Sequence, residues 1–135
     1  MAAYLEGLVE GGHAASRARL AGDVDIIVAD DPDAAYQRIA PHYLYQLNSY
    51  NQAGQRPLHA LEDLGDRHGN GRARVAVHLT VLTVDEAITE VRRRVEGLPV
   101  EHVYTWSTVA EMPDDLAARH RELWLGPVRD ALITQ

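Results

Sequence analysis

The residues best suited to contact a ligand lie in the stretch APHYLYQLNSY, residues 40–50. Three tyrosines, a histidine, a glutamine and an asparagine stand close together there. At helical spacing His42 and Tyr45 share one face, whereas Tyr43 and Tyr50 share another. Tyrosine suits surfaces that are dry on one side and wet on the other. We therefore expect this segment to be a contact surface, with a plain solvated face as the alternative.

A second candidate group stands near the end of the run VEHVYTWS, residues 100–107. Tyr104 and Trp106 alternate along a predicted strand, so their side chains share a face, and Ser107 follows them. Two aromatic side chains on one face of a strand either line a pocket or pack beneath a helix. The spacing alone leaves both alternatives open.

Several other kinds of chemistry are excluded by the sequence or receive no support from it. The chain has no cysteine, and all 13 of its basic residues are arginine, which excludes thiolate chemistry, a Schiff-base lysine and a phosphate-binding lysine of the Walker type. The seven histidines are scattered without a metal-binding motif, so we expect no metal site. The glycines lack the strand and helix context of a dinucleotide fingerprint. No catalytic residue can be named from spacing.

Composition limits the class of protein. A chain of 135 residues with 46% hydrophobic and 24% charged residues fits one globular domain, residues 1–135. The net charge of −7 argues against a nucleic-acid partner. No apolar run approaches the roughly 18 residues of a membrane span. The N-terminus MAAYLEGLVEGG lacks the basic region of a secretion signal, so we expect a cytoplasmic location.

The elements that position the candidate residues alternate between helices and strands. In the first half, the hydrophobic pattern predicts a helix at Ala2–Val9 and a further helical turn at Ser16–Ala21. The β-branched run Asp23–Ala29 predicts a buried strand. A helix should begin at Pro32, and Pro41 should kink or restart it.

The second half begins with a long loop, Asn51–Arg74, which is rich in glycine. A possible strand, Val75–Leu82, precedes a capping box that starts at Thr83 and opens a helix. Another strand is predicted at Val100–Ser107, and a final helix at Asp114–Ile133. This order predicts an α/β fold with parallel strands. Two or three such strands lack enough neighbours to be covered in a monomer.

Two long stretches resemble the C-terminal portion of bacterial luciferase-like monooxygenases. The first contains the strand DVDIIVA and the turn ADDPDAA that opens a helix, and the second contains LTVDEA, VEHVYTWS and MPDDL. Each motif is ordinary by itself, and the resemblance rests on their order and spacing. It covers most of the chain outside the loop Asn51–Arg74.

The resemblance implies a fold and a location for the site. Members of that family are (β/α)8 barrels, in which Asp23–Ala29 would be the seventh strand and Val100–Ser107 the eighth. Strands one to six have no counterpart, so the expected fold is a partial barrel of two or three parallel strands with flanking helices. By resemblance, the candidate substrate-binding residues border the flavin site or lie on the substrate side of the barrel: Tyr104, Trp106, Ser107, His42, Tyr45 and Tyr50.

The function that the resemblance implies is monooxygenase-type redox chemistry on a small organic molecule, with reduced flavin (FMN) or deazaflavin as cofactor. The missing strands would be supplied by a homodimer or a partner subunit, since two-fold association is the commonest way to cover such a surface. Two alternatives stay open. One is a non-catalytic subunit or binding module without the cofactor, and the other is a cofactor-free enzyme built on the remnant of the barrel.

Overall fold

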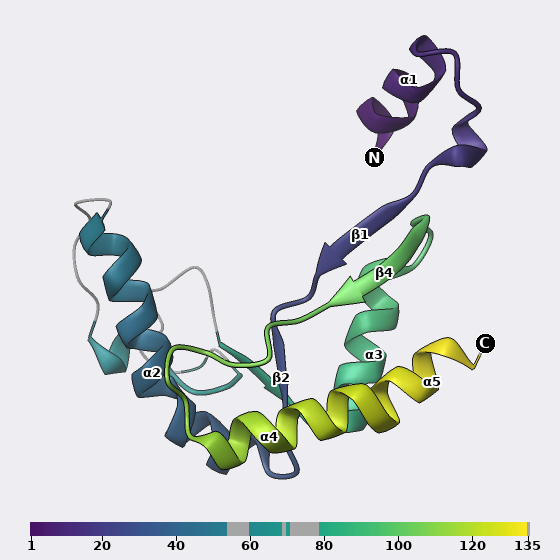
Figure 1. Cartoon of the computed structure of the whole chain (residues 1–135). Coiled ribbons are helices and arrows are strands. Elements are labelled where there is room, and N and C mark those ends of the chain that lie inside the picture. Colours follow the sequence, from purple (N-terminus) through teal and green to yellow (C-terminus); the bar gives the residue numbers. More distant parts are fainter. Residues whose placement is uncertain (54–59, 69, 71–78, 135) are drawn as a thin grey trace.

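The structure is a computed structural model that describes residues 1–53, 60–68, 70 and 79–134. The first half of the chain forms α1 (Ala2–Glu10), the 3₁₀ turn η1 (Ala15–Arg17), β1 (Leu20–Asp23), β2 (Ile26–Val28) and α2 (Pro32–Ala53). The second half forms the 3₁₀ turn η2 (Leu61–Asp63), β3 (Thr80–Leu82), α3 (Val84–Val95), β4 (Val100–Tyr104), α4 (Asp114–Leu123), the π-helical turn η3 (Trp124–Val128) and α5 (Arg129–Ile133). Figure 1 shows their arrangement.

The strands that the structure describes form two short parallel pairs. β1 pairs with β4, from Leu20 opposite Val100 to Asp23 opposite Tyr104, and β2 pairs with β3. β1 runs almost directly into β2, and the chain bends between them at Asp25, whose φ of 47° is left-handed. The predicted α/β class and the predicted parallel pairing are confirmed.

Three predicted boundaries are wrong. The helical turn predicted at Ser16–Ala21 is present only as η1, which ends at Arg17, because the chain enters β1 at Leu20, where β4 supplies a strand partner. The predicted strand Asp23–Ala29 is interrupted at the bend and continues only as β2. The predicted helix Asp114–Ile133 is broken at Gly126, whose φ and ψ of −100° and −105° are not helical and which precedes a proline.

The remaining expectations are met in part. Helix α2 continues through Pro41 to Ala53, past the predicted start of the loop. The predicted strand Val100–Ser107 ends at Tyr104. Of the possible strand Val75–Leu82, the part that the structure describes forms β3, and residues 75–78 lie outside the described residues.

The core lies on the two faces of β2, all of whose residues are buried. On one face, Ile27 packs with buried residues of α2, with Val81 of β3 and with Ala117 of α4. On the other face, Ile26 and Val28 pack against buried side chains of α3, α4 and η3. Coverage by helices on both faces explains why β2 is apolar throughout, as parallel strands usually are.

The β1–β4 pair and α1 extend away from this core. Figure 1 shows α1 beyond the end of the β1–β4 pair and apart from the other helices. Helix α1 has no buried residue, and no residue of β1 or β4 is fully buried. Among the described residues, no helix combines the length and the apolar character that crossing a bilayer requires.

Candidate functional site

A hollow with a volume of about 490 Å³ lies beside the C-terminal half of α2 and the segment that follows β4. We call it the Trp106 hollow. The residues of its lining that matter most for its chemistry come from the bend before β2, from α2, from the start of β3 and from the segment after β4: Asp25, Tyr43, Tyr50, Leu79, Thr105 and Trp106. Its volume falls in the usual range for sites that bind small organic molecules.

The carboxylate of Asp23 fixes two walls of the Trp106 hollow. Its Oδ2 accepts a hydrogen bond of 3.0 Å from Nε1 of Trp106. Its Oδ1 accepts another of 3.0 Å from the backbone amide of Asp25. The second bond closes a turn around the left-handed residue, a conformation that aspartate tolerates better than most residues. Asp23 therefore holds the indole of Trp106 and the backbone of Asp25 at fixed positions.

Asp25 is the charged group of this lining. Partial burial raises the pKa of its carboxyl, the negative charge of Asp23 raises it further, and Arg94 lowers it. Among the described residues that line the hollow there is no arginine, lysine or histidine. Burial, followed by the charge of Asp25, raises the pKa of Tyr43 to about 12, so that this phenol stays neutral. Among the described residues of the lining, Asp25 is therefore the one acidic group, and it lies beside aromatic side chains that carry no charge.

Side chains bridge β2 to the segment that carries Trp106. The hydroxyl of Thr105 donates to the carbonyl oxygen of Ile26 at 2.9 Å. The amide of Val28 donates to Nδ1 of His120 at 3.0 Å, which leaves Nε2 of His120 to donate to the carbonyl oxygen of Trp106 at 3.1 Å. His120 is only 1% exposed, and burial lowers its pKa, which favours the neutral ring that this arrangement needs.

Helix α2 holds the same segment from the other side. Nδ1 of His42 donates to the carbonyl oxygen of Ala110 at 3.2 Å, and the amide of Ala110 donates to Oε1 of Gln46 at 3.2 Å. These two side chains lie one helical turn apart, so together they grip one residue. His42, which the sequence suggests as a substrate contact, therefore anchors the chain after β4.

The structure brings together only some of the predicted site residues. Trp106 and Tyr50 both line the Trp106 hollow, and their side chains are 63% and 69% exposed. Tyr104, Ser107 and Tyr45 are exposed and do not belong to its lining.

Sequence reasoning missed Asp23, Asp25 and His120. The spacing Asp-x-Asp at the start of an apolar run is a signal for the first two, because aspartate favours a left-handed bend. For His120 the signal is its place between the apolar residues Ala117 and Leu123 on one stripe of a helix.

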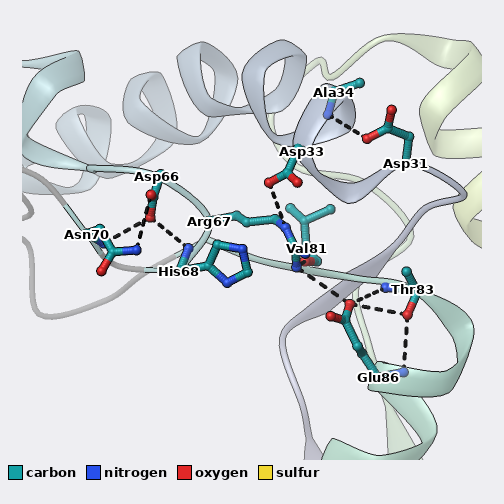
Figure 2. A network of polar contacts seen from close by, with 10 residues as sticks. All are labelled: Asp31, Asp33, Ala34, Asp66, Arg67, His68, Asn70, Val81, Thr83 and Glu86. Carbon is teal, nitrogen blue, oxygen red and sulfur yellow. Dashed lines mark hydrogen bonds and ion pairs between the residues drawn. The ribbon is translucent and has the colours of Figure 1, made fainter.

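The C-terminal ends of β2 and β3, where a barrel would have its site, carry a different cluster (Figure 2). Nε of Arg67 donates to Asp33 at 2.8 Å, and its Nη1 lies 3.5 Å from Glu86 and donates to the carbonyl oxygen of Val81 at 3.3 Å. Glu86 also closes the capping box with Thr83 at the start of α3. Two carboxylates neutralise the guanidinium, so this cluster joins the first turns of α2 and α3 and does not offer a phosphate site.

In the ranges that the structure describes, no three histidine, aspartate or glutamate side chains come close enough to hold a metal ion. Comparisons of the chain with protein-family models, with curated proteins and with solved structures find no match.

Proposed function

We propose that the chain binds a small organic molecule in the Trp106 hollow, as one part of a luciferase-like, flavin- or deazaflavin-linked redox enzyme that a second copy or a partner subunit completes. The observation that carries this proposal is the hollow itself. Its size suits a small molecule, and Asp23 holds its aromatic wall in place through the bond to Trp106. A wall that is already ordered lowers the entropic cost of binding.

Two features support the relation to a barrel. The strand–helix order of the chain is that of consecutive β/α units, and the strands that the structure describes pair in parallel, as barrel strands do. Of the proposed seventh strand, Asp23–Ala29, only Asp23 lies in β1 and pairs with β4, the proposed eighth strand, and the rest continues as β2, which pairs with β3. A two-stranded pair with exposed faces is marginal by itself. The exposure of the β1–β4 pair therefore supports association with another chain, in a cytoplasmic protein that has no nucleic-acid or membrane partner.

The cofactor fits only in part. Reduced FMN carries a phosphate, which proteins bind with arginine side chains or free helix N-termini. The charged residue of the hollow is Asp25, and Arg67 is already paired with Asp33 and Glu86. The described residues of the Trp106 hollow therefore do not fit the phosphate of FMN. In this proposal another chain holds that phosphate, and this chain supplies the pocket for the organic substrate.

The described residues of the hollow include no group that would bind a phosphate, which also favours a second candidate function, a non-catalytic binding module. Anaerobic titration of each oligomeric species with reduced FMN and with reduced deazaflavin separates the two. Binding by an assembled species supports the redox function. Failure of every species to bind either cofactor rejects it and leaves the binding module.

Binding in the hollow can be tested without any cofactor. Phenethyl alcohol is a neutral probe of suitable size, and nuclear magnetic resonance can follow the indole N–H signals of the two tryptophans. We expect the signal of Trp106 to shift on titration and that of Trp124 to stay in place. Trp106→Leu should weaken binding while the protein stays folded, because the side chain is largely exposed. An unchanged Trp106 signal at saturating probe would contradict the proposal.

A further inference from the structure

We infer that the Trp106 hollow selects ligands that carry a protonated amine beside an apolar body. This inference rests on the proposed function, since it names the chemical class of molecule that the same hollow binds. Three features of the lining lead to it: a carboxylate without a basic neighbour among the described lining residues, aromatic side chains in the same lining, and an apolar floor.

The carboxylate of Asp25 is placed to receive a cation. Its backbone is held by the bond from its amide to Asp23, and the bend before β2 puts it in the lining. Arg94 is the cation that acts on it, but that guanidinium is engaged elsewhere. Its Nη1 donates to the carbonyl oxygen of Val24 at 2.6 Å and its Nε to Glu90 at 2.7 Å. A ligand ammonium group would supply a counter-charge inside the hollow, which the described residues of the lining do not provide.

The aromatic residues add a second attraction for the same group. Cations are drawn to the faces of tryptophan and tyrosine, and the effect is strongest for tryptophan. Trp106, Tyr43 and Tyr50 all belong to the lining, and Tyr43 keeps its neutral phenol. A negative carboxylate beside such rings favours ammonium groups over neutral ones and opposes carboxylates and phosphates.

The rest of the lining suits the body of such a ligand. Ile27, Leu79 and Val109 are buried side chains that contribute an apolar surface. Thr80 and Thr108 add hydroxyl groups to the lining. A primary amine on a short aromatic or branched aliphatic skeleton matches this combination.

Three probes with similar skeletons test the inference: phenethylamine, phenethyl alcohol and hydrocinnamate, which are cationic, neutral and anionic near neutral pH. We expect phenethylamine to bind about five- to tenfold more tightly than phenethyl alcohol, and hydrocinnamate more weakly than both. The Trp106 indole signal reports binding in each titration. Equal affinity for the amine and the alcohol, or tighter binding of the anion, would overturn the inference while the proposed function stands. Failure of all three probes to bind would overturn both.

Asp25→Asn identifies the group responsible. Asparagine tolerates the left-handed backbone at this position, so the variant should fold, and circular dichroism can verify this. We expect the variant to lose the preference for phenethylamine, so that it binds the amine and the alcohol with similar affinity. Glu10→Gln, an equal change of charge on the distant helix α1, is the matched control and should keep the preference. Equal loss in both variants would mean that the net charge of the protein selects the amine, and would overturn the role of Asp25.

Discussion

His120 joins β2 to the segment after β4, and its removal should destabilise the protein by an amount that the contacts predict. Its two ring nitrogens pair with the amide of Val28 and the carbonyl oxygen of Trp106. In His120→Leu both backbone groups lose their partner, at a cost of about 1–3 kcal/mol each. The buried leucine side chain offsets about 1.5–2 kcal/mol of this loss. We therefore expect the free energy of unfolding to fall by about 2 kcal/mol, the middle of a range of about 0–4.5 kcal/mol.

The pH dependence of the same variant tests the protonation state of the ring. Burial lowers the pKa of His120 below its ordinary value of 6.5, so the unfolded chain binds more protons than the folded protein in the window between the two values. The stability that the neutral ring of His120 gives the folded protein is fully present above the unfolded-state pKa. It is lost as the pH falls through the folded-state pKa. The stability difference between wild type and variant should therefore shrink between about pH 8 and about pH 5.

Urea unfolding followed by circular dichroism measures both effects. His102→Leu is the matched control, because His102 lies exposed on β4, and it should change the free energy of unfolding little. If His120→Leu were as stable as wild type at both pH values, the bridge would not hold the segment. A stability difference between wild type and variant that grew as the pH fell would refute the inference that the ring of His120 is neutral in the folded protein.

The remaining predictions concern other contacts. Arg67→Met should lower the free energy of unfolding by about 1–3 kcal/mol, because its carboxylate and carbonyl partners lose their donor. Arg93→Met, which removes an exposed ion pair, should change the free energy of unfolding little. Similar losses of stability in both variants, measured by urea unfolding, would contradict the expectation that the less exposed arginine, Arg67, contributes more. Thr105→Val should cost about 1 kcal/mol through the lost bond to Ile26, and Thr105→Ser should not; equal stability of the two variants would count against that bond. The preference for phenethylamine should decline as the pH falls through the raised pKa of Asp25, whose charged and titratable neighbours are Asp23, Arg94 and Tyr43. A preference that is unchanged in acid would show that the carboxylate of Asp25 does not select the amine.

Features with local causes could be predicted from the sequence. The capping box is the clearest case, since Thr83 and Glu86 stand three residues apart and make both of the expected bonds, at 2.8 and 3.3 Å. The start of α2 at Pro32 and the burial of β2 also follow from a few adjacent residues. The parallel class followed from the order of these elements.

Features with distant causes could not be predicted in this way. Leu20 belongs to a strand because Val100 and its neighbours pair with it. Trp106 owes its position to Asp23, which is 83 residues earlier, and His120 bonds to the amide of Val28, 92 residues earlier. No periodicity in the sequence reports such pairs. The tyrosine-rich segment 40–50 is predicted to be a contact surface, but which of its faces lines a hollow depends on the packing of the segment after β4.

Intermolecular nuclear Overhauser effects show whether the ligand binds beside Trp106. With phenethylamine bound, we expect contacts from the probe to the ring of Trp106, to Tyr50 and to Leu79, which line one hollow. A second groove of about 380 Å³, lined by Val103, Trp124 and Leu132, is the natural competitor. Contacts confined to those residues, with none to Trp106, would show that the ligand binds in the second groove and would reject the Trp106 hollow as its site.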